Sequence, residues 1–276
     1  MRYATPMKAI VVVAAAFLVV GSWAVPASGE RPDTVSLEDL TWTELAELVR
    51  SGTTTVIVPV GGTEQNGPHM ALGKHNVRVK ILSERIARAL GRALVAPVIA
   101  YVPEGQLDPR TGHMRFPGTI TVPDEAFRRV LEGAARSVRL HGFRDIVILG
   151  DHGSTQTGAQ TVATRLNREW ARSEVRVHAI EAYYRAATVG FAQLLKTRGY
   201  RDDELGPHAS LPDTSLMLAV DPRMVRTERL RRESGSNKND GVDGDPSRAS
   251  AELGQLGVNL IIRQTVEAIR TSMGSR

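Results

Sequence analysis

The feature that most constrains the fold is an alternation between short β-branched apolar segments and amphipathic segments of helical periodicity. In the amphipathic segments, apolar residues recur every three or four positions, as on one face of a helix. A chain that alternates strands and helices builds a mainly parallel sheet with helices on both faces. We therefore predict a three-layer αβα sandwich. The predicted strands lie in residues 53–62, 93–102, 143–150 and 175–184, and the predicted helices between them lie in residues 76–90, 124–138 and 156–170.

The length and composition fit one α/β domain. The chain has 276 residues, of which 42% are apolar, enough to build a substantial core. We expect this domain to span residues 28–276, with a first helix over residues 36–52 and a closing helix that contains Leu256 and Leu260. Residues 231–252 are polar and glycine-rich, which predicts an excursion over the surface.

The first 27 residues have the order of a secretory signal peptide. Arg2 and Lys8 precede an uncharged apolar stretch over residues 9–20, and the small residues Val25 and Ala27 follow. We expect residues 1–27 to be removed, which predicts a periplasmic or secreted protein without stable membrane association. The alternative is an uncleaved N-terminal anchor.

Composition excludes thiolate chemistry and argues against a nucleic-acid partner. The chain has no cysteine, so no thiolate can act as nucleophile or ligand, and any metal must be held by His, Asp or Glu. The net charge is +5, and it is +3 without Arg2 and Lys8, since 33 basic and 30 acidic residues remain. The basic residues are scattered and aromatic residues make up only 5% of the chain, so no nucleic-acid partner is predicted.

Acidic and imidazole side chains follow two of the predicted strands. Glu64 and His75 come after the strand in residues 53–62, and Asp151 and His152 come after the strand in residues 143–150. Ligands of parallel sheets bind beyond the carboxyl ends of the strands, so these groups are predicted to share one edge. Zinc-type ions bind imidazole nitrogen and carboxylate oxygen, which makes this edge a candidate metal site. Residue types alone leave open the alternative that these are hydrogen-bonded structural residues.

Several motifs resemble those of the creatininase (creatinine amidohydrolase) family. The first of them is similar to the family pattern E-x-H-G-x-H-L-P-x-x-T-D, and the others match further family segments in the same order. The resemblance covers residues 55–255 and implies the creatininase-like fold, a homo-oligomer, and a site of divalent ions joined by an aspartate. The matching stretches are "GGTEQNGPHMALGKH", "HMRFPGTIT", "GDHGS", "HASLPDTS" and "GDPSRASAELG".

The chain departs from the family pattern at the metal positions. Asn66 replaces a family histidine, His75 replaces the bridging aspartate, and Ser154 stands where some members have a glutamate. An imidazole has one free nitrogen for a metal and cannot bridge two ions as a carboxylate can. We therefore predict a reduced site with one divalent ion, Zn²⁺ with Mn²⁺ as the alternative, held by Glu64, His75 and His152.

The resemblance also assigns roles around the ion. His208 and Asp213 match the family's catalytic histidine and acidic residue. We expect Asp213 to accept a proton from water or to complete the coordination shell, and His208 to polarise the substrate or protonate the leaving nitrogen. Asp151 is expected to orient His152, and His113 to shape the rim.

We predict a metal-dependent hydrolase of a non-peptide C–N bond in a small or cyclic amide, with a small-molecule substrate. Two alternatives remain open at this stage. The first is a non-catalytic periplasmic binding protein on the same scaffold. The second is a metal-dependent lactone or ester hydrolase, which the same ion chemistry would permit.

Overall fold

Four parallel strands form the central sheet of the computed structural model, which describes residues 33–230 and 240–274. Their order is β2-β1-β3-β4, so the two longest strands lie in the middle. β1 and β3 pair along their whole length, from Thr55 beside Asp145 to Val60 beside Gly150. Their carboxyl ends therefore lie together. The strands are β1 (Thr55–Val60), β2 (Ala93–Val95), β3 (Asp145–Gly150) and β4 (Arg176–Ala179).

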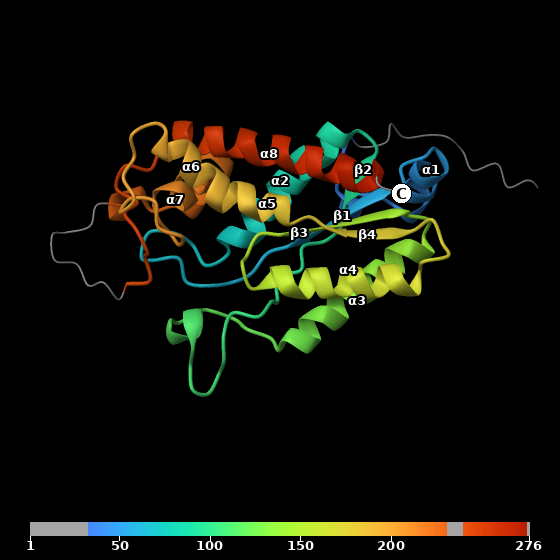
Figure 1. Ribbon diagram of the computed structural model, residues 1–276, viewed down its shortest axis with the longest axis horizontal. Coiled ribbons are helices and arrows are strands. Elements are labelled where there is room, and N and C mark those ends of the chain that lie inside the picture. Colours follow the sequence, from blue (N-terminus) through green and yellow to red (C-terminus); the bar gives the residue numbers. More distant parts are fainter. Residues whose placement is uncertain (1–32, 231–239, 275–276) are drawn as a thin grey trace, which may run out of the picture. The chain divides into compact units, whose positions relative to one another are not determined.

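Helices from both halves of the chain cover one face of the sheet (Figure 1). The apolar core on this face joins Ile57 and Val147 of the sheet to Leu82 of α2 and Ile261 of α8. The helices of this layer are α2 (Lys74–Leu90), α5 (Glu181–Arg185), a π-helical turn (Ala186–Gly190), α6 (Phe191–Lys196), α7 (Leu211–Val220) and α8 (Ala251–Gly274).

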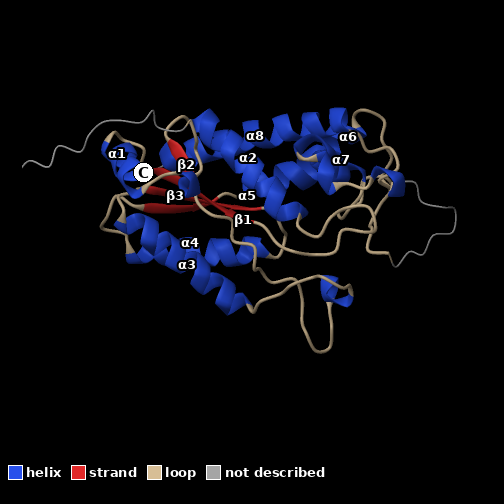
Figure 2. Ribbon diagram, turned by 180° about the vertical axis from the view of Figure 1, so that it is seen from behind, coloured by secondary structure: helices blue, strands red, loops and turns tan. Residues whose placement is uncertain are grey.

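The opposite face carries a second core. Val58 and Ile148 of the sheet pack there with Phe127 of α3 and Leu166 of α4. Seen from behind, the strands lie between the two groups of helices (Figure 2). This arrangement confirms the predicted three-layer αβα sandwich. The helices of this layer are α1 (Trp42–Arg50), α3 (Asp124–Leu140) and α4 (Thr155–Glu169).

Three predicted elements are shorter in the structure. The strand predicted over residues 175–184 ends at Ala179, and residues 181–184 belong to helix α5. The helix predicted over residues 36–52 divides into a 3₁₀ turn (Leu37–Asp39) and α1, because Thr41 caps α1 in a capping box with Glu44. Only Ala93–Val95 of the apolar run 93–102 forms a strand. Pro97, which has no N–H to donate to a sheet, follows shortly after β2.

Three further 3₁₀ turns lie in the connections. They are Gly112–Arg115, Pro222–Met224 and Thr227–Arg229. The first lies within the irregular segment between β2 and α3, and it carries His113 toward the carboxyl ends of the strands. The predicted signal peptide, residues 1–27, and residues 231–239 of the predicted surface excursion lie outside the described residues.

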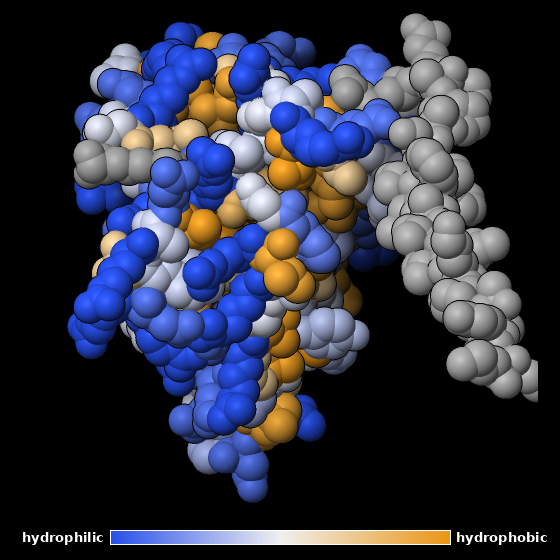
Figure 3. Space-filling view, turned by 90° about the vertical axis from the view of Figure 1, so that its right-hand side faces the viewer, coloured by the Kyte–Doolittle hydropathy of each residue, from blue (hydrophilic) through white to orange (hydrophobic). Residues whose placement is uncertain are grey.

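The opposite end of the molecule, where the strands begin, is shown in Figure 3. Apolar residues of the described part gather there in a band beside a broad area of hydrophilic residues. This pattern fits a sheet whose faces are covered by amphipathic helices. Within the described residues, none of the helices combines the length and the apolar character that crossing a membrane requires.

Candidate metal centre

Glu64, His75 and His152 converge at the carboxyl ends of β1 and β3. Glu64 lies in the loop after β1, His75 in the first turn of α2, and His152 directly after β3. Glu64 Oε1 lies 2.7 Å from His75 Nε2, and Glu64 Oε2 lies 3.1 Å from His152 Nε2. One donor atom from each residue lies within 4.8 Å of the other two. The structure thus brings together the three residues that the sequence predicted as ligands.

Hydrogen bonds orient both imidazoles toward this point. His75 Nδ1 lies 2.5 Å from Asp151 Oδ2 and donates to it, which directs Nε2 toward Glu64. Ser154 Oγ donates to the Pro103 carbonyl at 2.5 Å and therefore accepts from His152 Nδ1 at 2.7 Å. Such outer partners set the tautomer that a metal needs. Asp151 therefore orients His75 rather than His152, whose Nδ1 faces Ser154.

Glu104 is a fourth donor at this point, and the sequence analysis missed it. Its Oε2 lies 3.2 Å from His152 Nε2, and the residue is only 4% exposed. Apart from this ion-pair contact, neither of its carboxylate oxygens has a hydrogen-bond partner among the described residues, which is rare for a buried carboxylate. Burial and the neighbouring Glu64 raise the pKa of Glu104 to about 8. A bound cation would satisfy both oxygens.

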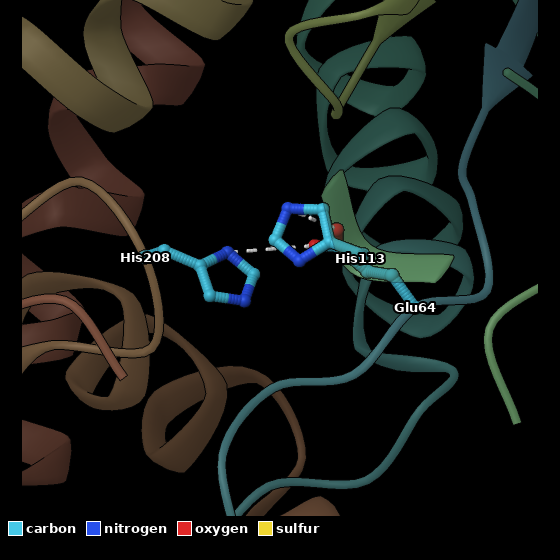
Figure 4. Close-up of side chains that lie close together, drawn as sticks. All are labelled: Glu64, His113 and His208. Atoms are coloured by element: carbon cyan, nitrogen blue, oxygen red, sulfur yellow. Dashed lines mark ion pairs between the residues drawn. The ribbon is translucent and has the colours of Figure 1, made fainter. Parts of the chain in front are cut away.

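His113 and His208 form a second imidazole group beside Glu64. Their ring centroids are 4.4 Å apart, and Figure 4 shows contacts from both rings leading to the Glu64 carboxylate. His113 Nε2 lies 3.1 Å from Glu64 Oε2, and His208 Nδ1 lies 3.6 Å from Glu64 Oε1. His113 was predicted to shape the rim, but its 3₁₀ turn brings the ring onto the carboxylate itself. These three residues form a second group of potential metal donors.

Gln65 determines the proton positions of this imidazole pair. Its Oε1 accepts from Gly67 N at 2.9 Å, so its amide nitrogen faces His113 Nδ1 at 3.0 Å and donates to it. The proton of His113 is then on Nε2, which lies 3.1 Å from Glu64 Oε2. His208 Nε2 donates to the Gln65 carbonyl at 2.9 Å, which leaves His208 Nδ1 with a lone pair.

Buried cations surround the acidic groups from the side of α2. Lys74, only 1% exposed, lies with its Nζ 3.8 Å from Glu64 Oε1 and in contact with Asp213 Oδ2. Arg78, one turn further along, binds Asp213 Oδ1 at 2.5 Å and Asp151 Oδ2 at 2.7 Å. Burial alone would raise the pKa of Asp213, but Lys74 and Arg78 hold it well below its ordinary value. Asp213 therefore lies beside the ligands, with both oxygens bound to cations.

The pKa shifts give Glu64 and His208 different charge states. Burial would raise the pKa of Glu64, but His75, His152 and Lys74 hold it well below the ordinary range, so the carboxylate is ionised. Burial lowers the pKa of His208 to about 3, and Lys74 acts in the same direction. His208 is therefore neutral, with a free Nδ1 that can accept a hydrogen bond.

Two backbone positions show how tightly the site is built. A Cβ on Gly62 would lie 2.6 Å from Glu104 Oε1, and its φ of +153° favours glycine. Ala209, directly after His208, has a φ of +52°, which is uncommon for a residue with a side chain. Its N–H donates to Asp213 Oδ2 at 3.0 Å, and this bond holds the strained turn that presents His208.

A cleft of about 1110 Å³ opens over these groups. The π-helical turn contributes Thr188 and Val189 to one side, and the 3₁₀ turn with Arg115 and Phe116 contributes to the other. Within the described residues, no salt bridge or hydrogen bond of the Arg115 side chain is observed. The cleft is at the large end of the range for small-molecule sites, so it can accommodate more than a small ring.

The donor set fits a divalent metal ion. The Nε2 atoms of two imidazoles and two carboxylates face the same point, and among the described residues one of these carboxylates has no hydrogen-bond partner. Nitrogen and oxygen donors of this kind suit zinc and manganese. Asn66, which replaces a family histidine, does not supply a donor to the metal site. Asn66 donates its amide to the carbonyls of Glu64 and Ala71, and thus ties its own loop together.

The Creatininase model, described as creatinine amidohydrolase, matches residues 38–269. This chain belongs to the creatininase family. The match spans most of the chain and includes all the residues of the candidate centre, so the resemblance inferred from the sequence motifs is confirmed. Membership of this family identifies the chain as a hydrolase of the amidohydrolase type, as predicted.

Characterised relatives differ in what they act on. A mycofactocin precursor peptide peptidase of Mycobacterium tuberculosis is 29% identical over 226 residues, which cover 73% of this chain and 78% of that protein. A creatinine amidohydrolase of Pseudomonas putida is 25% identical over 253 residues, covering 86% of this chain and 96% of that enzyme. The family scaffold therefore serves both a small cyclic amide and a peptide.

Solved structures of the family have the same fold. A creatininase crystal structure matches with a TM-score of 0.73 and 24% identity, covering 89% of this chain and 100% of that chain. A creatininase variant in a Zn–Zn form matches with a TM-score of 0.70 and 25% identity, covering 88% and 99% of the two chains. A manganese form of creatininase also matches, with a TM-score of 0.72, 24% identity, and coverage of 87% and 99%. Divalent ions are thus a property of the family structures.

Proposed function

We propose that this protein hydrolyses the C–N bond of an amide at a centre with one divalent ion. This proposal rests on the convergence of Glu64, His75 and His152. Both imidazoles are oriented by hydrogen bonds at their Nδ1 atoms. Glu104 completes the donor set. Zn²⁺ is the ion that two imidazoles and carboxylates favour, and Mn²⁺ is the alternative.

The ion would supply Lewis acidity, which polarises the amide carbonyl and makes water easier to deprotonate. The chain's own residues handle the protons. His208 lines the cleft, with its Nδ1 3.6 Å from Glu64 Oε1, and is the group that we assign to accept a proton from the attacking water. The same nitrogen returns this proton to the leaving amine as the C–N bond breaks, so that amide and water yield an acid and an amine.

His113 and Asp213 support these steps from different sides. His113 Nε2 carries its proton toward the reaction centre and can donate to a substrate oxygen as negative charge develops on it. Asp213, whose oxygens are bound to Lys74, Arg78 and the backbone of Ala209, positions His208. We therefore assign Asp213 a positioning role in place of the proton-accepting role inferred from the family pattern.

The substrate proposed here is a non-peptide amide, linear or cyclic, that is larger than creatinine. The cleft volume and the apolar contribution of the π-helical turn favour a substrate with an apolar part. A short peptide is a second candidate, because the relative in M. tuberculosis is a peptide peptidase and this cleft has room for more than one residue.

Metal analysis combined with a substrate panel tests the proposal. We expect about one tightly bound Zn²⁺ or Mn²⁺ per chain, and loss of both ion and activity in His152→Ala. Chelator-sensitive cleavage of cyclic amides, but not of lactones or short peptides, supports the non-peptide assignment. Cleavage of lactones alone would favour the ester hydrolase alternative, and a metal-free protein that binds panel compounds without turnover would favour the binding-protein alternative.

Export and self-association stay predictions. We propose that residues 1–27 are removed on export to the periplasm or the medium, and that the mature chain forms a homo-oligomer. N-terminal sequencing of protein from those compartments tests the first proposal, because retention of Met1 would favour the anchor. Sedimentation velocity of the purified protein tests the second.

A further inference from the structure

Arg115 differs from the other strongly basic residues that line the cleft, because it has no acidic partner among the described residues. The other two, Lys74 and Arg78, are buried and bind Asp213. The Arg115 side chain is exposed at the cleft. A guanidinium stays protonated in proteins, so the cleft has one cationic group whose charge a ligand can neutralise.

The segment that carries Arg115 is held in place by backbone hydrogen bonds. Within its 3₁₀ turn, Phe116 N donates to the His113 carbonyl at 3.0 Å. Shortly after the turn, Thr119 Oγ1 accepts from Gln65 N at 3.1 Å. A backbone fixed in this way presents the arginine from a defined point, which lowers the entropy cost of binding a ligand.

Arg115 is also close to the proposed reaction centre. His113 Nε2 lies 3.1 Å from Glu64 Oε2, and Arg115 follows His113 by two residues in the same 3₁₀ turn. Cα atoms two residues apart are separated by at most about 7 Å. The guanidinium can therefore reach a group that is a few bonds away from an amide bound at the centre.

The acidic residues of the cleft lining leave this guanidinium unpaired. Three of the four take part in the network around the centre, namely Glu64, Asp151 and Asp213. The fourth, Asp243, lies beside His208, because its N–H donates to the His208 carbonyl at 2.9 Å. Within the described residues it forms no ion pair with Arg115. The partner that Arg115 lacks can thus come from a bound substrate.

We propose that Arg115 binds a carboxylate of the substrate, so that the substrate is an amide with a carboxylate near the bond that is cleaved. This inference rests on the proposed function and names its substrate class. The planar guanidinium can donate two parallel hydrogen bonds to a carboxylate. Two kinds of amide carry such a group. N-acyl amino acids have it on the amine side of the amide, and monoamides of dicarboxylic acids have it on the acyl side.

The experiment uses matched pairs of amides that differ only at the charged group. In each pair, the carboxylate of one member is replaced by a neutral hydroxymethyl group in the other. Both kinds of amide are included, and kcat and KM are measured for Zn²⁺-loaded wild type, Arg115→Gln, Arg115→Lys and Arg110→Gln. Arg110 is the matched control, because it is exposed in the same irregular segment but does not belong to the cleft lining.

We expect wild type and Arg110→Gln to prefer the carboxylate member by at least about tenfold in kcat/KM, the usual effect of a charge-assisted hydrogen bond. Arg115→Gln should lose this preference mainly through a higher KM for the carboxylate, with kcat/KM for the neutral member unchanged. Arg115→Lys should keep part of it, since an ammonium retains the charge but not the paired geometry. The kind of amide that shows the preference identifies the side of the bond that carries the carboxylate.

The outcomes separate this inference from the proposed function. A preference that persists in Arg115→Gln, that falls equally in Arg110→Gln, or that wild type lacks would overturn the role of Arg115 while leaving a metal hydrolase intact. If no amide is cleaved, the proposed function fails, and titration calorimetry with the same pairs still tests Arg115. Carboxylate binding about tenfold weaker in Arg115→Gln than in wild type supports the role. Equal binding by both proteins, or no binding by wild type, overturns it.

Discussion

Arg78 should be among the residues that contribute most to stability, because it neutralises two buried carboxylates at once. It is 4% exposed, its Nε lies 3.1 and 3.0 Å from the two oxygens of Asp151, and its Nη1 lies 2.5 Å from Asp213 Oδ1. Replacement by methionine keeps an apolar stem of similar length but removes the charge. Both carboxylates then lose a buried partner.

The expected loss in the free energy of unfolding for Arg78→Met is about 3–5 kcal/mol, the usual effect of breaking a buried ion pair from one side. For a chain of this size, such a loss lowers the melting temperature by roughly 6–20 °C. Urea unfolding followed by circular dichroism measures the change. Chelator is present throughout, because a bound ion would add its own stabilisation to the folded state.

Arg129→Met is the matched control. Arg129 also lies on a helix and pairs with Glu125 at 2.6 Å, but its side chain is 77% exposed. Water and salt screen such a pair, so we expect no measurable change. A double variant, Arg78→Met with Asp151→Asn, should lose less stability than the two single variants together, because the second change removes the unpaired charge. A loss below about 1 kcal/mol in Arg78→Met would refute the reasoning, since that is the range of surface pairs.

Three further predictions concern the residues around the ion. Tyr183→Phe removes a buried hydroxyl that donates to Asp151 Oδ1 at 2.5 Å, and should cost about 1.5–3 kcal/mol in urea unfolding, with little change in the far-ultraviolet spectrum. Glu104→Gln should weaken Zn²⁺ binding at least about tenfold in a chelator competition, and wild-type affinity would exclude Glu104 from the donor set. Gly62→Ala forces a Cβ against Glu104 and should destabilise the protein by about 1–3 kcal/mol, whereas Gly133→Ala, with nothing within 4 Å of the added Cβ, should stabilise α3 by about 0.5–1 kcal/mol.

The fold was predictable because it depends on patterns that persist over many residues. β1 and β3 are buried along their whole length, and each reads as an apolar run. Helices such as α3 present one apolar stripe, whose spacing is visible without a structure. The ends of elements were less predictable, because a single capping residue such as Thr41 or a proline such as Pro97 decides where an element stops.

The candidate site was predictable only where a strand led directly to the side chain. Glu64 and His152 follow the two central strands, and the rule for parallel sheets located both of them. Glu104 obeys the same rule, since it follows the apolar run 93–102, but only three residues of that run form a strand. The signal was therefore present, although the strand that precedes Glu104 is short.

Lys74 and Arg78 could not have been recognised from sequence alone. Lysine and arginine are almost always solvated, so their default interpretation is an exposed helix face. Their burial follows from Asp151 and Asp213, which approach α2 from distant parts of the chain. Only the three-dimensional structure reveals that pairing.

The positions of these groups along the chain set an order of assembly during synthesis. Glu64, Glu104 and His152 leave the ribosome in the first 152 residues, together with the strands that bring them together. Asp213, the partner of Lys74, emerges some sixty residues later, with the segment that lines the remaining side of the cleft. Until then Glu64 is the one carboxylate partner of Lys74 among its observed ion pairs, so the pairing of this lysine is completed only when α7 docks.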